Sequence, residues 1–162
     1  MDWGGDSITL LEARQWLRKR VNEGTDCPCC KRFAKVYKLK INTNMARFLI
    51  SVARKKTEWV HYNECDYVGR DYPWIRLWGL AETSKSEETK KNMSGLWRIT
   101  NKGRLFIHNE ITVPLHVYAY DGEVIRASEE QVSVVESLGD KFNYQELMDG
   151  IVPPSVTTEL FD

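Results

Sequence analysis

The sequence of 162 residues is long enough for one globular domain, or for one domain with additional segments. It contains no run of about 18 apolar residues, which excludes a predicted membrane-spanning helix. Its first residues lack the basic-then-apolar order of a signal peptide, so we expect a cytoplasmic protein whose four cysteines are reduced or bound to metal rather than paired in disulfides.

The formal net charge is zero, but the charges are distributed unevenly along the chain. Residues 121–162 contain ten acidic and two basic residues, a net charge of −8, whereas the first 120 residues contain 21 basic and 13 acidic residues, a net charge of +8. This asymmetry is typical of a nucleic-acid-binding body with an acidic appendage. Two solvated faces that neutralise each other, within one chain or across a dimer, are the alternative.

The first predicted element is a helix that begins at Ser7 or Thr9 and continues to about residue 22. Glu12 lies three residues after Thr9, the spacing of a capping box. We expect an apolar stripe of this helix to pack on the core. The opposite face is basic and is either solvated or in contact with phosphates; it contains Arg14, Arg18, Lys19 and Arg20.

A cysteine-rich turn follows at Cys27-Pro28-Cys29-Cys30. The spacing of Cys27 and Cys30 provides half of a tetrahedral zinc site, because a tight turn directs two thiolates at one ion. His61 and Cys65 are the candidates for the other two ligands, and the fold would have to bring them close. A structural zinc ion is therefore one interpretation; reduced cysteines without metal and a redox pair stay open as alternatives.

Residues 35–41 alternate in polarity, which predicts a half-buried strand with a basic outer face. The residues expected on its inner face are Tyr37, Leu39 and Ile41. An Asn-Thr-Asn sequence beginning at Asn42 can then cap a helix. Three helices are predicted after this cap, at about 44–55, 63–68 and 72–78.

The third of these helices carries the residues of greatest functional interest. Asp71 can cap it, Pro73 is tolerated in its first turn, and Gly79 can end it. Helical spacing places three residues on one buried face: Trp74, Leu77 and Trp78. The residues expected to be exposed are Arg70, Asp71, Tyr72, Ile75 and Arg76.

Two short strands, 80–83 and 96–99, come next, separated by a polar loop (residues 84–95) that we call the wing. A helix at about 101–109, capped by Thr100, follows them. Helix, strand, charged loop and strand is the order found in winged helix-turn-helix domains. In such a domain Arg76 would read base edges in the major groove, assisted by Arg70 and Tyr72. Phosphates would be held by Lys85, Lys90, Lys91 and Arg98.

The C-terminal part is acidic and is built around a predicted hairpin. Asp121-Gly122 between alternating apolar segments is a strong hairpin signal. Two short helices are predicted at about 129–138 and 143–149, with caps at Ser128 and Asn143. Residues 151–162 are expected to form a flexible tail. The side chains expected to hold this acidic segment against the body, or against a partner, are Phe142, Tyr144, Leu147 and Met148.

Catalysis finds little support in the sequence. There is no glycine-rich phosphate loop, no metalloprotease motif and no nucleophile elbow. The three histidines are scattered, and no arrangement of a triad can be argued from their positions. We therefore predict that the protein is not an enzyme.

The motif Gly95-Leu-Trp-Arg-Ile-Thr100-x-x-Gly103-x-x-Phe106, preceded by Trp78-Gly-Leu80, is similar to the wing segment of winged-helix proteins, including the MarR-like group. Together with Cys27-Pro-x-Cys30, Tyr37 and Val113-Pro114, it also resembles a family of small phage proteins described as helix-turn-helix DNA-binding proteins. The first resemblance covers about residues 43–109, and the second extends more loosely to about residue 150. They imply binding to double-stranded DNA, regulation of transcription and location in the host cytoplasm.

The sequence thus predicts an α+β protein: a winged helix-turn-helix core with an N-terminal helix and a C-terminal β-hairpin plus short helices. The predicted segments are 1–26, 27–112, 113–150 and 151–162. The predicted function is that of a phage-type DNA-binding protein that regulates transcription. The alternative is a protein-interaction module, such as a phage inhibitor of a host or competitor protein, acting through an acidic face that mimics DNA. Homodimerisation and a protein partner for the acidic segment also stay open.

Overall fold

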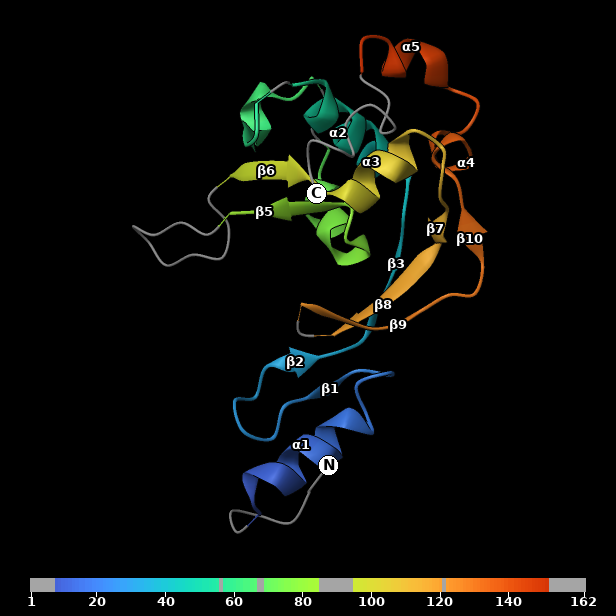
Figure 1. The fold of residues 1–162 in the computed structure, drawn as a ribbon. Coiled ribbons are helices and arrows are strands. Elements are labelled where there is room, and N and C mark those ends of the chain that lie inside the picture. The colour runs from blue at the N-terminus through green and yellow to red at the C-terminus, as the bar shows by residue number, and fades with distance from the viewer. Residues whose placement is uncertain (1–7, 56, 67–68, 85–94, 121, 152–162) are drawn as a thin grey trace. The chain divides into compact units, whose positions relative to one another are not determined.

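The computed structural model describes residues 8–55, 57–66, 69–84, 95–120 and 122–151. The fold is α+β, as predicted, with short helices and small antiparallel sheets (Figure 1). None of the helices among the described residues has the length and apolar character that crossing a membrane requires.

The chain divides into two compact units, each made of two separate segments. Unit 1 comprises Met1–Leu39 and Val117–Ala127, and unit 2 comprises Lys40–His116 and Ser128–Asp162. This division differs from the predicted one, which followed the order of the chain. The predicted acidic appendage, 113–150, contributes to both units because its hairpin strands pair with β3.

Unit 1 begins with helix α1 (Leu10–Arg18), whose N-cap is Thr9. The Thr9 hydroxyl accepts the N–H of Glu12, which confirms the predicted cap. Two hairpins complete the unit. One is formed by β1 (Thr25–Asp26) and β2 (Phe33–Ala34).

The second hairpin of unit 1 lies in a three-stranded sheet with the order β3-β8-β9. Its strands are β3 (Tyr37–Lys40), β8 (His116–Tyr120) and β9 (Glu123–Ala127). The β8–β9 hairpin confirms the prediction from Asp121-Gly122, and Gly122 has a φ of +77°. Tyr37 is exposed, although the alternation predicted it to be on the inner face. Tyr37 lies on β3, which is an edge strand.

Unit 2 is organised around helix α2 (Thr43–Arg54), which is buried on most of its circumference. Asn42 caps it by accepting the N–H of Met45 at 3.0 Å, as predicted. A helix that is apolar on most sides belongs in the centre of a unit. Accordingly, the elements that contact α2 include η2 (Tyr72–Trp78), β6 (Leu96–Ile99), α3 (Asn101–Ile107), α4 (Val134–Leu138) and α5 (Tyr144–Met148).

The β-strands of unit 2 form a small antiparallel sheet in the order β4-β6-β5. These strands are β4 (Val60–His61), β5 (Ala81–Thr83) and β6 (Leu96–Ile99). Helix α3 (Asn101–Ile107) follows β6 and is capped by the Thr100 hydroxyl, as predicted. Gly103 packs so closely on the carbonyl of Leu80 that a Cβ atom there would lie 2.0 Å from the oxygen.

The chain after the hairpin forms β10 (Gln131–Val132), which pairs with β7 (Val113–Pro114), and then two short helices, α4 (Val134–Leu138) and α5 (Tyr144–Met148). The predicted helix start at Ser128 is wrong. Ser128 accepts the N–H of His116, while Ser133 and Glu136 form a complete capping box for α4. Asn143 caps α5 as predicted.

Helix α5 and the segment before it pack on the body of unit 2, as predicted. The Tyr144 hydroxyl donates to the carbonyl of Ile107 at 2.6 Å. The guanidinium of Arg47 lies 4.2 Å from the centre of the Phe142 ring. Arg54 also donates to the carbonyl of Leu147. The acidic segment is therefore joined to α2 and α3 by aromatic and polar contacts.

Candidate nucleic-acid interface

The predicted recognition helix is present as η2 (Tyr72–Trp78), but it is a 3₁₀ helix of seven residues. It ends at Gly79, which has a φ of +74° and donates its N–H to the carbonyl of Arg76. Asp71 does not cap it. The Asp71 carboxylate instead accepts the side-chain amide of Asn42 at 2.9 Å, which fixes the start of η2 to the start of α2.

The pitch of η2 decides which residues face the core. Side chains three residues apart eclipse in a 3₁₀ helix, so Tyr72, Ile75 and Trp78 share the inward face. Ile75 and Trp78 are buried, whereas Trp74 is 39% exposed. The predicted burial of Trp74 and the predicted exposure of Ile75 are therefore both wrong, because they assumed the 3.6-residue period of an α-helix.

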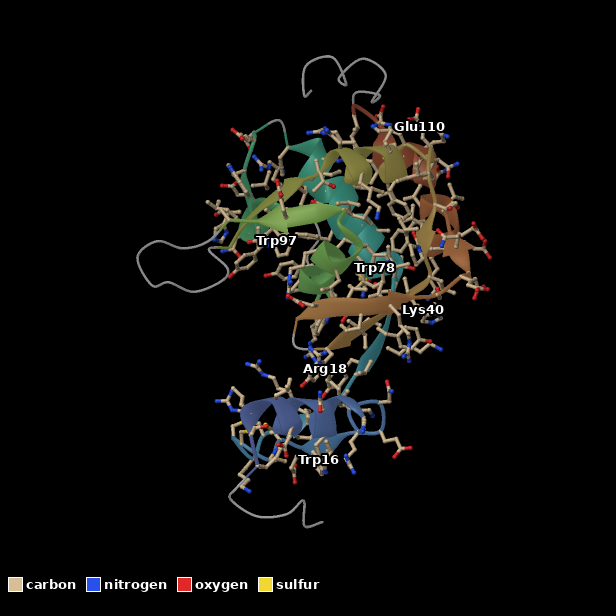
Figure 2. All side chains as sticks on the ribbon, turned by 60° about the horizontal axis from the view of Figure 1, so that its bottom comes forward. Trp16, Arg18, Lys40, Trp78, Trp97 and Glu110 are labelled. Atoms are coloured by element: carbon tan, nitrogen blue, oxygen red, sulfur yellow. The ribbon has the colours of Figure 1, made fainter. Side chains whose placement is uncertain are left out.

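Tyr72 belongs to an aromatic cluster rather than to the exposed surface of η2. Its ring centre lies 4.8 Å from that of Phe48, 5.5 Å from that of Trp97 and 5.8 Å from that of Tyr62. Desolvation, followed by the nearby Tyr62 and Cys65, raises the pKa of its hydroxyl. Its ring packs in this cluster and positions η2. Figure 2 labels two buried indoles of unit 2, Trp78 and Trp97, among the side chains around α2.

Arg70 and Arg76 are both exposed, as predicted. Neither takes part in an ion pair among the residues that the structure describes. Both guanidinium groups lie on the same short segment and are thus available to an anionic partner. The wing lysines Lys85, Lys90 and Lys91 lie outside the described residues.

Arg98 is engaged within the protein, in contrast to the predicted role in phosphate binding. Its Nη1 lies 2.9 Å from Oε1 of Glu58, and its Nε donates to Oε1 of Glu82 at 2.7 Å. The guanidinium also lies 4.3 Å from the centre of the Trp59 ring. Hydrogen bonding to Glu82 raises the pKa of Arg98. A phosphate would have to displace two carboxylates, because Arg98 joins β6 to Glu82 on β5 and to Glu58 before β4.

A cavity of about 760 Å³ adjoins Arg98 at the end of α2. Its lining includes four cationic side chains and two carboxylates: Arg54, Lys55, Arg98, Arg104, Glu58 and Glu82. Arg54 and Lys55 are themselves paired with Asp66. Sequence reasoning missed this cavity, because its residues come from four separate segments of the chain and show no local motif.

The Cys27–Cys30 turn connects β1 to β2. The N–H of Cys27 donates to the carbonyl of Arg32 at 2.7 Å, and the N–H of Lys31 donates to the carbonyl of Cys27 at 2.9 Å. Backbone hydrogen bonding at Cys30, and then at Cys29, lowers the pKa of the Cys27 thiol.

The four predicted zinc ligands are divided between the two units. Cys27 and Cys30 belong to unit 1, whereas His61 and Cys65 belong to unit 2. Among the described residues, no group of three or more histidine, cysteine, aspartate or glutamate side chains is arranged to hold a metal ion. His61 Nδ1 accepts the N–H of Asn63, and burial raises the pKa of the Cys65 thiol.

The opposite pKa shifts of two cysteines predict different reactivities. At a pH just above neutral, we expect Cys27 to react several-fold faster than Cys65 with iodoacetamide, because the thiolate is the nucleophile and a lower pKa increases its fraction. Peptide mapping by mass spectrometry after timed labelling measures both rates. The difference should disappear in denaturant, and equal rates in the folded protein would contradict the assignment.

Comparison of the chain with known protein families, with curated proteins and with solved structures finds no match.

Proposed function

We propose that the protein binds double-stranded DNA through η2 and the wing of unit 2, and that it regulates transcription. The observation that carries this proposal is the arrangement of η2. The inward residues Tyr72, Ile75 and Trp78 hold the segment on α2 and β6, while Arg70 and Arg76 are exposed. Arginine matches phosphate geometry and can bind guanine edges with two hydrogen bonds.

The charge distribution within unit 2 supports the same proposal. Residues 40–116 contain 13 basic and eight acidic residues, whereas residues 128–162 contain one basic and eight acidic residues. In Figure 1, α5 lies above α2 and α3, and the green segment that holds η2 lies below them. The acidic helix and η2 therefore lie on different sides of α2, so phosphates of DNA bound at η2 would not be repelled by the carboxylate of that helix.

The roles within this interface are as follows. Arg76 reads base edges and Arg70 holds a phosphate, while Tyr72 acts indirectly by fixing η2 to the aromatic cluster. The wing lysines 85, 90 and 91 are assigned to phosphates on the sequence alone. Since the proposed partner is cellular DNA, we also propose that the protein is located in the cytoplasm. For a phage protein, this is the cytoplasm of the host cell.

The acidic C-terminal segment favours a second candidate function, binding to a basic protein. Glu129, Glu130 and Glu136 are exposed, and the Glu136 side chain is held by the capping box of α4. Exposed carboxylates are suited to a basic protein surface, including one that otherwise binds DNA. An inhibitor of a host or competitor protein would use this face instead of η2.

Removal of the two exposed arginines tests the proposed interface. We expect Arg70→Ala combined with Arg76→Ala to weaken binding to a random duplex and to reduce the magnitude of the salt slope, d log K/d log[salt], by about 0.9, since only Arg70 is assigned to a phosphate and each lost phosphate contact contributes about that much. Fluorescence anisotropy across a salt titration measures this slope.

The matched control is Arg126→Ala combined with Lys141→Ala. This variant removes the same number of positive charges from residues 121–162, where no other basic residue occurs. Its slope should stay close to that of the unchanged protein. If both variants lose the same affinity, binding follows net charge alone, and η2 is not the interface.

A further inference from the structure

The turn between β1 and β2 has the construction of half a metal site. Cys27 and Cys30 are separated by two residues at the turn, and the hydrogen bonds Cys27 N–H to Arg32 O and Lys31 N–H to Cys27 O close it on both sides. One closed turn therefore carries two cysteines at the spacing of a zinc knuckle.

The backbone of the turn is strained at Lys31, which has a φ of +66°. A residue with a side chain is destabilised by roughly 1 kcal/mol in this left-handed region, where glycine is the residue usually found. Strained residues of this kind cluster at functional sites, where the surrounding structure holds them in place. Here the strained position directly follows Cys30 and allows the chain to reverse around the two thiols.

The turn lacks two of the four ligands of a structural zinc site. The described part of unit 1 contains no histidine, and its cysteines are Cys27, Cys29 and Cys30. The candidates in unit 2 are engaged elsewhere. His61 stacks on Tyr62 and accepts the N–H of Asn63, and its Nε2 packs so closely on Gly95 that a Cβ atom there would lie 2.8 Å away.

Cys65 is also engaged in unit 2. It is half-buried, and its thiol donates to the carbonyl of His61 at 4.0 Å. A zinc ion at the turn would therefore take its other two thiolates from another molecule. Cys29 and Cys30 are exposed, so a second protein can reach the turn.

We propose that the turn binds one zinc ion together with the same turn of a second copy of this chain. Cys27 and Cys30 of each copy provide four thiolates in a tetrahedral site on a two-fold axis. Binding releases one proton from each cysteine to solvent and changes no oxidation state, so that the four-thiolate centre carries a charge of −2. Exposed Lys31, Arg32 and Lys35 next to the turn offset this negative charge, and the negative centre in turn reduces the repulsion between the two basic turns.

The stoichiometry of zinc and chain tests this site. The full chain, purified in a reductant that does not bind metal and supplied with zinc, is examined by native mass spectrometry and by elemental analysis. We expect a dimer of the 18.9 kDa chain with about one zinc ion per two chains, and conversion to monomer when a chelator removes the metal.

Three variants separate this site from its competitors. Cys30→Ser should abolish both zinc and dimer, whereas Cys29→Ser, one residue away and equally exposed, should retain both. His61→Ala combined with Cys65→Ser should also retain both. Substitution of cobalt for zinc in the unchanged protein provides a readout that needs no variant, because four sulfur ligands give a different visible spectrum from a mixed sulfur and nitrogen set.

Several results would overturn the proposal. One zinc ion per chain that is lost in the His61/Cys65 variant would indicate a site within a single chain. A dimer that dissociates in reductant rather than in chelator would indicate a disulfide. Absence of zinc from the reduced protein, or a monomer that keeps its zinc, would also contradict it. None of these outcomes depends on DNA binding.

Discussion

Replacement of Trp78 by alanine will lower the free energy of unfolding by about 3–5 kcal/mol, whereas the same replacement at Trp74 will lower it by less than about 1 kcal/mol. Trp78 is 3% exposed and donates its indole N–H to the carbonyl of Pro114 at 2.7 Å. Its loss creates a cavity and leaves that carbonyl without its donor. Trp74, in the same element, is 39% exposed.

Urea denaturation of the two variants measures both changes. The pair is matched, because the residue type, the substitution and the element are the same, and only the position around η2 differs. Equal losses would mean that both indoles face the core, as an α-helix with Trp74, Leu77 and Trp78 on one side would require. That result would contradict the 3₁₀ arrangement of η2.

Replacement of Gly103 by alanine will lower the free energy of unfolding by about 2 kcal/mol, although alanine is the better helix former. Helix propensity alone would stabilise the variant by about 0.5–1 kcal/mol. The new Cβ atom, however, would lie 2.0 Å from the Leu80 carbonyl oxygen and 2.7 Å from a side-chain carbon of Ile99. Overpacking against a fixed backbone typically costs 1–3 kcal/mol or more, so the clash outweighs the propensity.

Asn101→Ala is the control for this prediction. Asn101 lies two residues earlier in α3 and is exposed, so its replacement should change the free energy of unfolding by less than about 0.5 kcal/mol. Chemical denaturation with a common slope for all variants provides the comparison. A Gly103→Ala protein that is as stable as the original would show that Gly103 of α3 does not pack closely on the Leu80 carbonyl.

Local signals in the sequence predicted much of the fold. Thr9, Asn42, Thr100 and Asn143 each cap the helix they were expected to cap, because an N-cap depends on hydrogen bonds to residues two or three positions away. The hairpin around Asp121-Gly122 is equally local. Such features are determined by a few neighbouring residues, so a single sequence contains the necessary information.

Features that depend on distant residues were not predictable in this way. Ser128 has a local capping signal, but the chain after it forms β10, which pairs with β7. The paired residues of β10 and β7 are 17 or more positions apart in the sequence, so local spacing does not indicate this pairing. The pitch of η2 depends on the packing of the Tyr72 ring against the rings of Phe48 and Trp97, which are distant from it in the sequence. Side-chain spacing alone favoured the commoner α-helical period.

The candidate site was predicted in part. The exposure of Arg70 and Arg76 follows from local sequence, since charged residues flank an apolar segment there. The engagement of Arg98 does not, because its partner Glu58 lies 40 positions away. Three of the seven proposed DNA contacts lie outside the described residues, and two of the other four, Tyr72 and Arg98, have internal roles.

The most direct test of DNA binding is the fluorescence anisotropy of a labelled random duplex of about 30 base pairs, titrated with the protein at two salt concentrations. We expect binding at the lower salt concentration that weakens steeply at the higher one. For each phosphate neutralised, log K should fall by about 0.9 for every tenfold increase in salt concentration. Absence of binding at the lower salt concentration would contradict the proposed function and would favour a protein partner for the acidic segment.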